Sequence, residues 1–250
     1  MQKQPLIILT GPTAVGKTKA SIGLAKAIGG EIISADSMQV YRKMDIGTAK
    51  IMPEEMDGVP HHLIDVLDPK EPFNVVLFKK LATKAMDDIY ARGRIPVIVG
   101  GTGFYIQAVL YDIHFDENDD DKSYRTYLEQ LAEKHGNLCL HQMLEKVDPA
   151  SAAAIHYNNR KRVIRALEFY KETGIPISEH NEKESKRISP YNFEYFVLND
   201  ARSKLYDRID RRIDIMVEQG LIEEVKALKD QGYTKDLISM QGLGYKEILD

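Results

Sequence analysis

The chain has 250 residues, a formal net charge of −4 and an apolar fraction of 43%. This length fits one α/β domain with a sizeable insertion or two small domains, and the composition excludes a fibrous or largely disordered chain. A single cysteine, Cys139, excludes an internal disulfide, and there is neither a signal peptide nor an apolar run of membrane-spanning length. We therefore expect a soluble, cytoplasmic protein with no membrane partner, whose charge balance does not by itself indicate nucleic acid.

Short apolar runs alternate with helical patterns in the first half of the chain. Pro5–Thr10, Glu31–Ala35 and Ile95–Val99 are predicted as buried strands because their apolar residues follow one another. Thr18–Ile28 and Phe73–Arg92 are predicted as helices from their apolar spacing. Strands that alternate with helices predict a parallel sheet with right-handed crossovers.

The pattern changes in the middle of the chain. Residues 116–121 are an acidic run, which we interpret as a solvated linker. Only helical patterns occur from Ser123 to Gly174, strand character returns at Phe193–Leu198, and a helical pattern then extends from Ser203 to Leu228. The predicted organisation is an α/β core over 1–115, an all-helical insertion over 116–190 and a return to the core over 191–250.

The turn between the first strand and the first helix matches the phosphate-loop pattern G-x-x-x-x-G-K-[ST] in full. Its backbone N–H groups and the start of the helix favour an anion of two or three phosphate groups. Lys17 adds a positive charge, and the Thr18 hydroxyl can hold Mg²⁺. We predict that a diphosphate binds to the whole loop: Gly11, Pro12, Thr13, Ala14, Val15, Gly16, Lys17 and Thr18.

The end of the third strand argues against a motor that hydrolyses ATP. Such proteins usually carry an acid after a second apolar strand to hold the metal. Here the strand is followed by Gly100, Gly101 and Thr102. The two glycines let backbone approach a ligand or only form a tight turn, and Thr102 offers a hydroxyl. This favours a small transferase.

Asp36 follows the second strand, at the edge where ligands bind in open α/β sheets. We interpret it as a group near the transferred atom that can accept a proton. The alternative, that Asp36 and Ser37 cap a turn, stays open at this point. A dinucleotide site is not favoured, because its glycine pattern is absent.

Several longer blocks carry a family resemblance. They are Asp36–Arg42, Met44–Lys50, Pro60–Asp65, Gly93–Pro96 with Gly100–Thr102, Arg208–Arg211 and Gly242–Lys246. Together with the phosphate loop, these blocks closely resemble the tRNA dimethylallyltransferase (tRNA isopentenyltransferase) family of the bacterial type. The resemblance spans nearly the whole chain, although family members usually continue beyond the position of Asp250.

The resemblance implies a P-loop kinase-like α/β core with a helical insertion that grips the anticodon stem-loop of tRNA. The implied reaction moves a dimethylallyl group from dimethylallyl diphosphate to N6 of adenine 37, with Mg²⁺. Asp36 would be the general base on the adenine amine. Thr13 and Arg211 would contact the diphosphate around the breaking C–O bond, and Lys17 and Thr18 would hold diphosphate and metal.

A basic stretch in the predicted insertion is the candidate nucleic-acid face. Asn159–Arg165 carries four cations, a pattern that alone is typical of a solvated surface. The resemblance implies that it contacts tRNA, that a weaker phosphate contact exists elsewhere in the insertion, and that the strand ends frame an extruded base. The implied tRNA-binding residues are Lys161, Arg162, Val163, Ile164 and Arg165, with Arg125 as the weaker contact, and Asp36, Ser37, Met38, Gln39 and Thr102 around the base.

Three other functions stay open from the sequence: a small-molecule P-loop kinase, an adenylate isopentenyltransferase that acts on free AMP, ADP or ATP, and a non-catalytic RNA-binding module. The arginines of the insertion favour a polymeric acceptor over a free nucleotide. An intact phosphate loop together with Asp36 argues against a module without catalysis. We expect a monomer.

Overall fold

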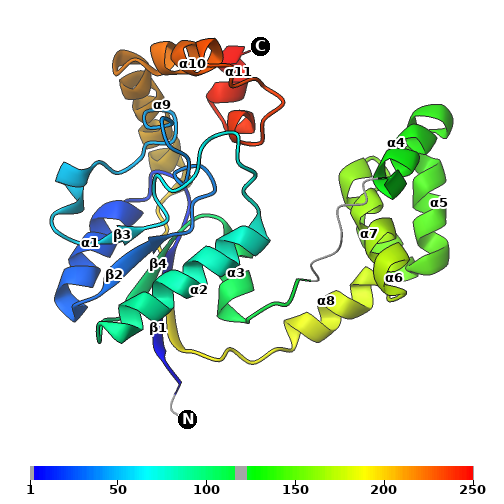
Figure 1. Ribbon diagram of the computed structural model, residues 1–250, viewed down its shortest axis with the longest axis horizontal. Coiled ribbons are helices and arrows are strands. Elements are labelled where there is room, and N and C mark those ends of the chain that lie inside the picture. The colour runs from blue at the N-terminus through cyan, green and yellow to red at the C-terminus, as the bar shows by residue number, and fades with distance from the viewer. Residues whose placement is uncertain (1–2, 116–122, 250) are drawn as a thin grey trace. The chain divides into compact units, whose positions relative to one another are not determined.

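The computed structural model describes residues 3–115 and 123–249, which form two compact units (Figure 1). The first unit comprises residues 1–113 and 189–250, and the second comprises residues 114–188. The predicted acidic linker lies outside the described residues. Within the described ranges, no helix is both long and apolar enough to cross a membrane.

A five-stranded parallel sheet forms the centre of the first unit. In sheet order its strands are β3 (His61–His62), β2 (Glu31–Ser34), β4 (Pro96–Gly100), β1 (Pro5–Thr10) and β5 (Asn192–Val197). The predicted α/β class, with a parallel sheet and a helical insertion, is confirmed. Only β3 was not predicted, because a strand of two residues carries no apolar periodicity.

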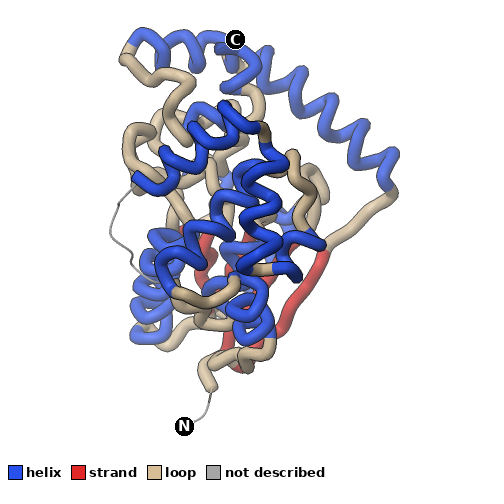
Figure 2. Tube along the Cα trace, turned by 90° about the vertical axis from the view of Figure 1, so that its right-hand side faces the viewer, coloured by secondary structure: helices blue, strands red, loops and turns tan. Residues whose placement is uncertain are grey.

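Successive residues of the strands fill two cores, one on each face of the sheet. One core packs against α1 (Lys17–Ile28) and contains Ile7, Ile32 and Val97. The other packs against α2 (Val75–Ala91) and α3 (Gly103–Leu110) and contains Leu6, Ile8, Ile33 and Ile98. Figure 2 shows the strands in red among the helices in blue. The run of apolar residues in each strand is explained by this burial on both faces.

The predicted helix over 203–228 is two helices in the structure. α9 (Arg202–Glu218) and α10 (Leu221–Asp230) are separated by Gly220, whose φ of 100° interrupts the helical geometry. Two short elements follow, the 3₁₀ turn η2 (Ser239–Gln241) and α11 (Tyr245–Leu249). Another 3₁₀ turn, η1 (Pro53–Met56), lies between β2 and β3.

The second unit consists of helices in its described part, as predicted. They are α4 (Ser123–His135), α5 (Asn137–Val147), α6 (Pro149–Ala154), α7 (Arg160–Thr173) and α8 (Ile177–Ser185). Its core includes Leu128, Leu140, Leu144, Val163 and Leu167. Asp148 caps α6 through the N–H of Ser151 and also accepts a hydrogen bond from the Ser178 hydroxyl, so it joins α6 to α8.

A buried carboxylate lies at the amino end of β2. The side chain of Glu31 is 3% exposed and accepts hydrogen bonds from Arg92 Nη2 (2.7 Å) and Nε (3.1 Å). His62 Nε2 lies 2.7 Å from its Oε2. Burial opposes ionisation of Glu31, but the hydrogen bonds from Arg92 and His62 outweigh it and lower the pKa of this carboxyl. Glu31 therefore joins β2 to β3 and to the chain after α2.

We predict that Glu31→Gln lowers the free energy of unfolding by about 2 kcal/mol near neutral pH, because charge-assisted hydrogen bonds to a buried acceptor are lost. The lowered pKa means that the carboxylate stabilises the fold above its unfolded pKa, and that this contribution disappears as the pH falls through the folded pKa. Thermal unfolding from about pH 7 to about pH 3 should therefore show the two proteins converging in acid. A stability difference that does not change with pH would contradict this role of the charge.

Candidate active site

The carboxyl ends of β1, β4 and β2 meet at one edge of the sheet. The phosphate loop follows β1, and Asp36 follows β2, with β4 between them. A Cβ on Gly100, the last residue of β4, would overlap the carbonyl of Ala35. The Thr10 hydroxyl donates a hydrogen bond to the Gly100 carbonyl (2.9 Å), which joins the ends of β1 and β4. The close approach predicted at Gly100 is thus an approach of the protein's own backbone.

Lys17 begins α1 and folds over the phosphate loop. Its ammonium donates hydrogen bonds to the carbonyls of Gly11 (2.9 Å) and Pro12 (2.8 Å). The cap residue Gly16 supplies no side chain, so the N–H groups at the start of α1 remain for an anion. Burial lowers the pKa of Lys17, the charge of Asp36 opposes this shift, and the charge of Arg212 adds to it. Thr13 and Thr18 are exposed on the same loop.

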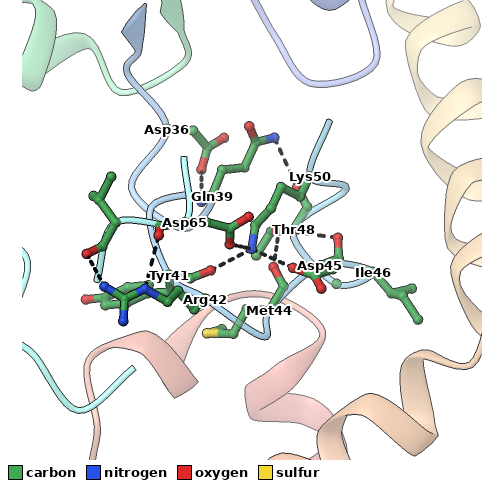
Figure 3. Close-up of polar contacts among 12 residues, drawn as sticks. Asp36, Gln39, Tyr41, Arg42, Met44, Asp45, Ile46, Thr48, Lys50 and Asp65 are labelled. Atoms are coloured by element: carbon green, nitrogen blue, oxygen red, sulfur yellow. Dashed lines mark hydrogen bonds and ion pairs between the residues drawn. The ribbon is translucent and has the colours of Figure 1, made fainter. Parts of the chain in front are cut away.

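Asp36 uses one carboxylate oxygen to hold a turn (Figure 3). Its Oδ1 accepts hydrogen bonds from the N–H groups of Met38 (2.8 Å) and Gln39 (3.3 Å). The turn-capping alternative is therefore correct for this oxygen. Oδ2 has no hydrogen bond to the described residues, and the carboxylate interacts electrostatically with Lys17 and Arg212. Asp36 can cap its turn and still present one oxygen to a ligand.

The arginine near Lys17 and Asp36 is Arg212, and not Arg211 as predicted. Arg211 is exposed, whereas Arg212 is half-buried on the same helix. Burial lowers the pKa of Arg212, and the charge of Asp36 raises it. Adjacent helical residues point about 100° apart, and it is the half-buried Arg212 that interacts with Asp36 and Lys17. Arg212 is therefore the stronger candidate for the arginine of this site, and the contact of Arg211 with the diphosphate stays a prediction.

A sequence signal for Arg212 did exist. It belongs to the stripe Leu205, Ile209, Arg212 and Met216, which has helical spacing and whose other members are buried or half-buried. One turn before it, Arg208 donates hydrogen bonds to the Ala14 carbonyl (3.4 Å) and to Asp200 (2.8 Å). Periodicity of the helix, and not the local motif, therefore identifies the arginine of the site.

An open pocket lies next to the phosphate loop. Its polar lining is formed by Lys17, Thr18, Ser21, Ser34, Asp36, Gln39 and His61, and its apolar lining by Ile32, Ile51, Ile64 and Val99. His61 Nδ1 lies 2.8 Å from the Val59 carbonyl, and burial lowers the pKa of this histidine, so the ring is neutral near pH 7. The lining thus places a lysine and polar groups, which suit an anion, beside apolar side chains, which suit a short apolar chain.

The predicted base-framing residues gather at the same edge. Ser37, Met38 and Gln39 are half-buried in the turn that Asp36 caps. The Gln39 amide donates hydrogen bonds to the carbonyls of Thr48 (3.3 Å) and Ala49 (3.2 Å) (Figure 3). Thr102, the cap residue of α3, donates its N–H to the carbonyl of Ala35 (3.4 Å). These residues therefore lie beside the phosphate loop, as a shared site requires.

In the helical unit, the side chains of Lys161, Arg162 and Arg165 are exposed on α7. Val163 and Ile164 are 0% and 4% exposed and pack in the core of the unit. Their predicted contact with tRNA is wrong for the side chains, because the apolar face of an amphipathic helix is used for folding.

The side chain of Arg125 also forms its contacts within the helical unit. It forms a two-bond ion pair with Glu168, at 2.6 and 2.8 Å, which raises the pKa of the guanidinium. This pair joins α4 to α7. The positive charge of Arg125 is therefore compensated inside the unit, against its prediction as a phosphate contact.

Comparison with known proteins matches nearly the whole chain. The sequence model of the IPP transferase family matches residues 39–250, and that of the isopentenyl transferase family matches residues 4–67. A curated relative, a tRNA dimethylallyltransferase from Lachnoclostridium phytofermentans, is 63% identical over 245 residues, which cover 98% of this chain and 78% of the relative.

Solved structures give the same picture. A full-length tRNA isopentenylpyrophosphate transferase from Bacillus halodurans is 52% identical, with a TM-score of 0.68 over 98% of this chain and 76% of that one. A tRNA delta(2)-isopentenylpyrophosphate transferase from Staphylococcus epidermidis is 46% identical, with a TM-score of 0.67 over 98% and 80%. A eukaryotic dimethylallyltransferase described as acting on tRNA is 32% identical, with a TM-score of 0.79 over 97% and 60%. The chain belongs to the IPP transferase family.

Proposed function

We propose that this chain transfers a dimethylallyl group from dimethylallyl diphosphate to N6 of adenine 37 in the anticodon stem-loop of tRNA. The observation that carries this proposal is the position of Asp36, whose Oδ2 is not used by the turn and which lies in the field of Lys17 and Arg212 beside a phosphate loop. The name of the relative that is 63% identical, a tRNA dimethylallyltransferase, supports the same reaction.

An allylic diphosphate is already activated, so the protein has to stabilise the leaving group and align the amine. The loop N–H groups, Lys17 and Arg212 oppose the charge that develops as the C–O bond breaks. Thr13 contacts the diphosphate near that bond. As the new N–C bond forms, N6 becomes positive and its proton passes to Asp36 Oδ2. This scheme needs no protein nucleophile.

The donor atoms of the loop fit a Mg²⁺ ion. Among the described residues, no group of three His, Cys, Asp or Glu side chains could hold a metal unaided. Mg²⁺ commonly combines few protein oxygens with substrate phosphates and water. Thr18, exposed in the first turn of α1, would hold it, and a bound ion would supply positive charge against the diphosphate.

The exposed cations Lys161, Arg162 and Arg165 support tRNA, and not a free nucleotide, as the acceptor. An adenylate isopentenyltransferase has no evident use for such a helical unit. A kinase is disfavoured because Gly101 and Thr102 follow β4 where a metal-binding acid would be expected. The monomeric state stays a prediction.

The proposed function is tested by incubating the protein with Mg²⁺, dimethylallyl diphosphate and unmodified tRNA, followed by mass analysis of the nucleosides. Parallel reactions replace tRNA with AMP, or dimethylallyl diphosphate with ATP. We expect isopentenyladenosine in tRNA alone. Prenylation of AMP without prenylation of tRNA, or turnover of ATP without prenyl transfer, would overturn the proposal.

We predict that Asp36→Asn slows single-turnover prenyl transfer by roughly 10²- to 10⁴-fold, the usual range for the loss of a general base. The asparagine oxygen can still cap the turn, so the affinity for dimethylallyl diphosphate should not change. Single turnover with saturating tRNA removes product release from the measurement. A rate within a few-fold of wild type would leave Asp36 as a structural residue only.

We predict that Arg212→Ala slows the same step by about 10²- to 10³-fold and weakens diphosphate binding, because one charge that opposes the leaving group is removed. Arg211→Ala is the matched control, since it removes the same charge from the preceding residue of the same helix. The control should stay within about threefold of wild type. The reverse ranking of the two variants would restore the original prediction for Arg211.

We predict that Arg165→Ala weakens tRNA binding without affecting diphosphate affinity. The slope of the logarithm of the binding constant against the logarithm of salt concentration should become shallower by about one, as expected for one lost phosphate contact. Lys183→Ala is a control that removes one exposed cation from α8 of the same unit. Titrations of both variants with tRNA at several salt concentrations distinguish an effect of the position of the lost charge from an effect of the lower net charge of the unit. Equal effects of the two substitutions would mean that only the overall charge of the unit matters.

A further inference from the structure

The segment of residues 36–50 carries the predicted base-framing residues Asp36–Gln39 but contains no helix or strand. Turn hydrogen bonds within the segment, donated by the N–H groups of Tyr41, Ala49 and Lys50, fix part of its conformation, and bonds to other elements fix the rest. Only an isolated bridge between Tyr41 and Leu67 pairs its backbone with another segment in sheet fashion, within the described residues. Backbone hydrogen bonds also join residues 39–42 to residues 65–67, and side chains of distant elements hold residues 45–47.

Glu224 on α10 holds one part of this segment. Its Oε2 accepts hydrogen bonds from the N–H groups of Asp45 (2.9 Å) and Ile46 (2.8 Å). Its Oε1 accepts hydrogen bonds from the N–H of Gly47 (3.1 Å) and from the Tyr245 hydroxyl (2.5 Å). One carboxylate thus satisfies three consecutive backbone donors, which are bonds to a charged acceptor and so stronger than neutral ones.

Tyr245 on α11 completes this contact. Its side chain is fully buried, and burial raises the pKa of the hydroxyl, so the hydroxyl stays protonated and donates a hydrogen bond to Glu224. A Cβ on Gly47 would lie only 2.5 Å from Cε2 of the Tyr245 ring, so the ring rests directly on the Gly47 backbone. Met38 packs in the same way on Gly242, where a Cβ would lie 2.5 Å from the Met38 Cε.

Hydrogen bonds and ion pairs connect residues 45–47 to the site, and Figure 3 shows some of them. The buried Lys50 ammonium binds Asp45 Oδ1 (2.6 Å), Asp65 Oδ1 (2.5 Å) and the Tyr41 carbonyl (2.6 Å). The carbonyls of residues 48 and 49 accept hydrogen bonds from the side-chain amide of Gln39. Gln39 belongs to the turn that Asp36 caps. Glu224 itself is absent from the lining of the pocket.

We propose that Glu224 and Tyr245 are positioning residues for the acceptor half of the reaction. They hold residues 45–47, and through residues 48 and 49 they keep Gln39 and the Asp36 turn in place. This inference rests on the proposed function. Because neither residue contacts the phosphate loop, their loss should impair transfer to tRNA and leave diphosphate binding unchanged.

The test is Glu224→Gln, which keeps the size of the side chain but turns an NH₂ group toward backbone donors. Single-turnover prenyl transfer at saturating tRNA should fall by about 10- to 100-fold, the scale expected for a small misplacement of reacting groups. Calorimetric affinity for dimethylallyl diphosphate should stay within about threefold of wild type. Glu223→Gln, the exposed neighbour on α10, is the matched control and should leave both quantities unchanged.

Tyr245→Phe removes only one hydrogen bond and should give a smaller loss of transfer in the same direction, so it keeps the proposal falsifiable if Glu224→Gln does not fold. Amide hydrogen exchange supplies a readout that does not depend on activity: exchange at residues 45–47 should accelerate in Glu224→Gln and stay unchanged in the phosphate loop. Normal transfer by both variants, or equal losses of transfer and diphosphate affinity, would overturn the inference. A wild-type protein that does not prenylate tRNA would instead overturn the proposed function.

Discussion

The contact between Gly100 and the backbone of Ala35 sets the geometry on which the rest of the site depends. β4 lies between the strand that leads to the phosphate loop and the strand that leads to Asp36. Neighbouring strands are about 4.8 Å apart, so the loop and Asp36 start about 10 Å from each other. A ligand that contacts both has to span this distance across the end of β4, where Gly100 lets the backbone of Ala35 pack directly against the strand.

Charged side chains lie at both ends of the distance between the phosphate loop and Asp36. Lys17 and Arg212 are both partly buried, which lowers the pKa of each, and the carboxylate of Asp36 opposes both shifts. In the proposed reaction, these two cations would stabilise the leaving diphosphate, and the one anion would accept a proton from the amine that becomes positive. Asp36 can both cap its turn and present an oxygen to a ligand, because two N–H donors bind Oδ1 and Oδ2 has no hydrogen-bond partner within the described residues.

The sequence predicted the features that depend on neighbouring residues and missed those that depend on packing. Four strands and the phosphate loop were found because runs of apolar residues and the spacing of glycines are local signals. Whether Arg211 or Arg212 faces the site depends on the rotation of α9, which its buried residues Leu205 and Met216 determine. Equally, the local charge pattern around Val163 does not reveal that this residue belongs to the core. Partners distant in sequence, such as Glu168 for Arg125, are invisible without the fold.

Buried charge acts together with apolar packing to maintain the segment of residues 36–50, whose Val40, Tyr41 and Met44 lie in the core. Burying the Lys50 ammonium costs free energy, which two carboxylates and a carbonyl offset. The Glu224 carboxylate is similarly surrounded by donors. Hydrogen bonds to charges are directional, whereas apolar contacts tolerate sliding, so these groups can hold a segment that lacks regular structure in one conformation. In the proposed reaction, the phosphate loop would hold the diphosphate, and α10 and α11 hold the segment of residues 36–50 that would face the acceptor base.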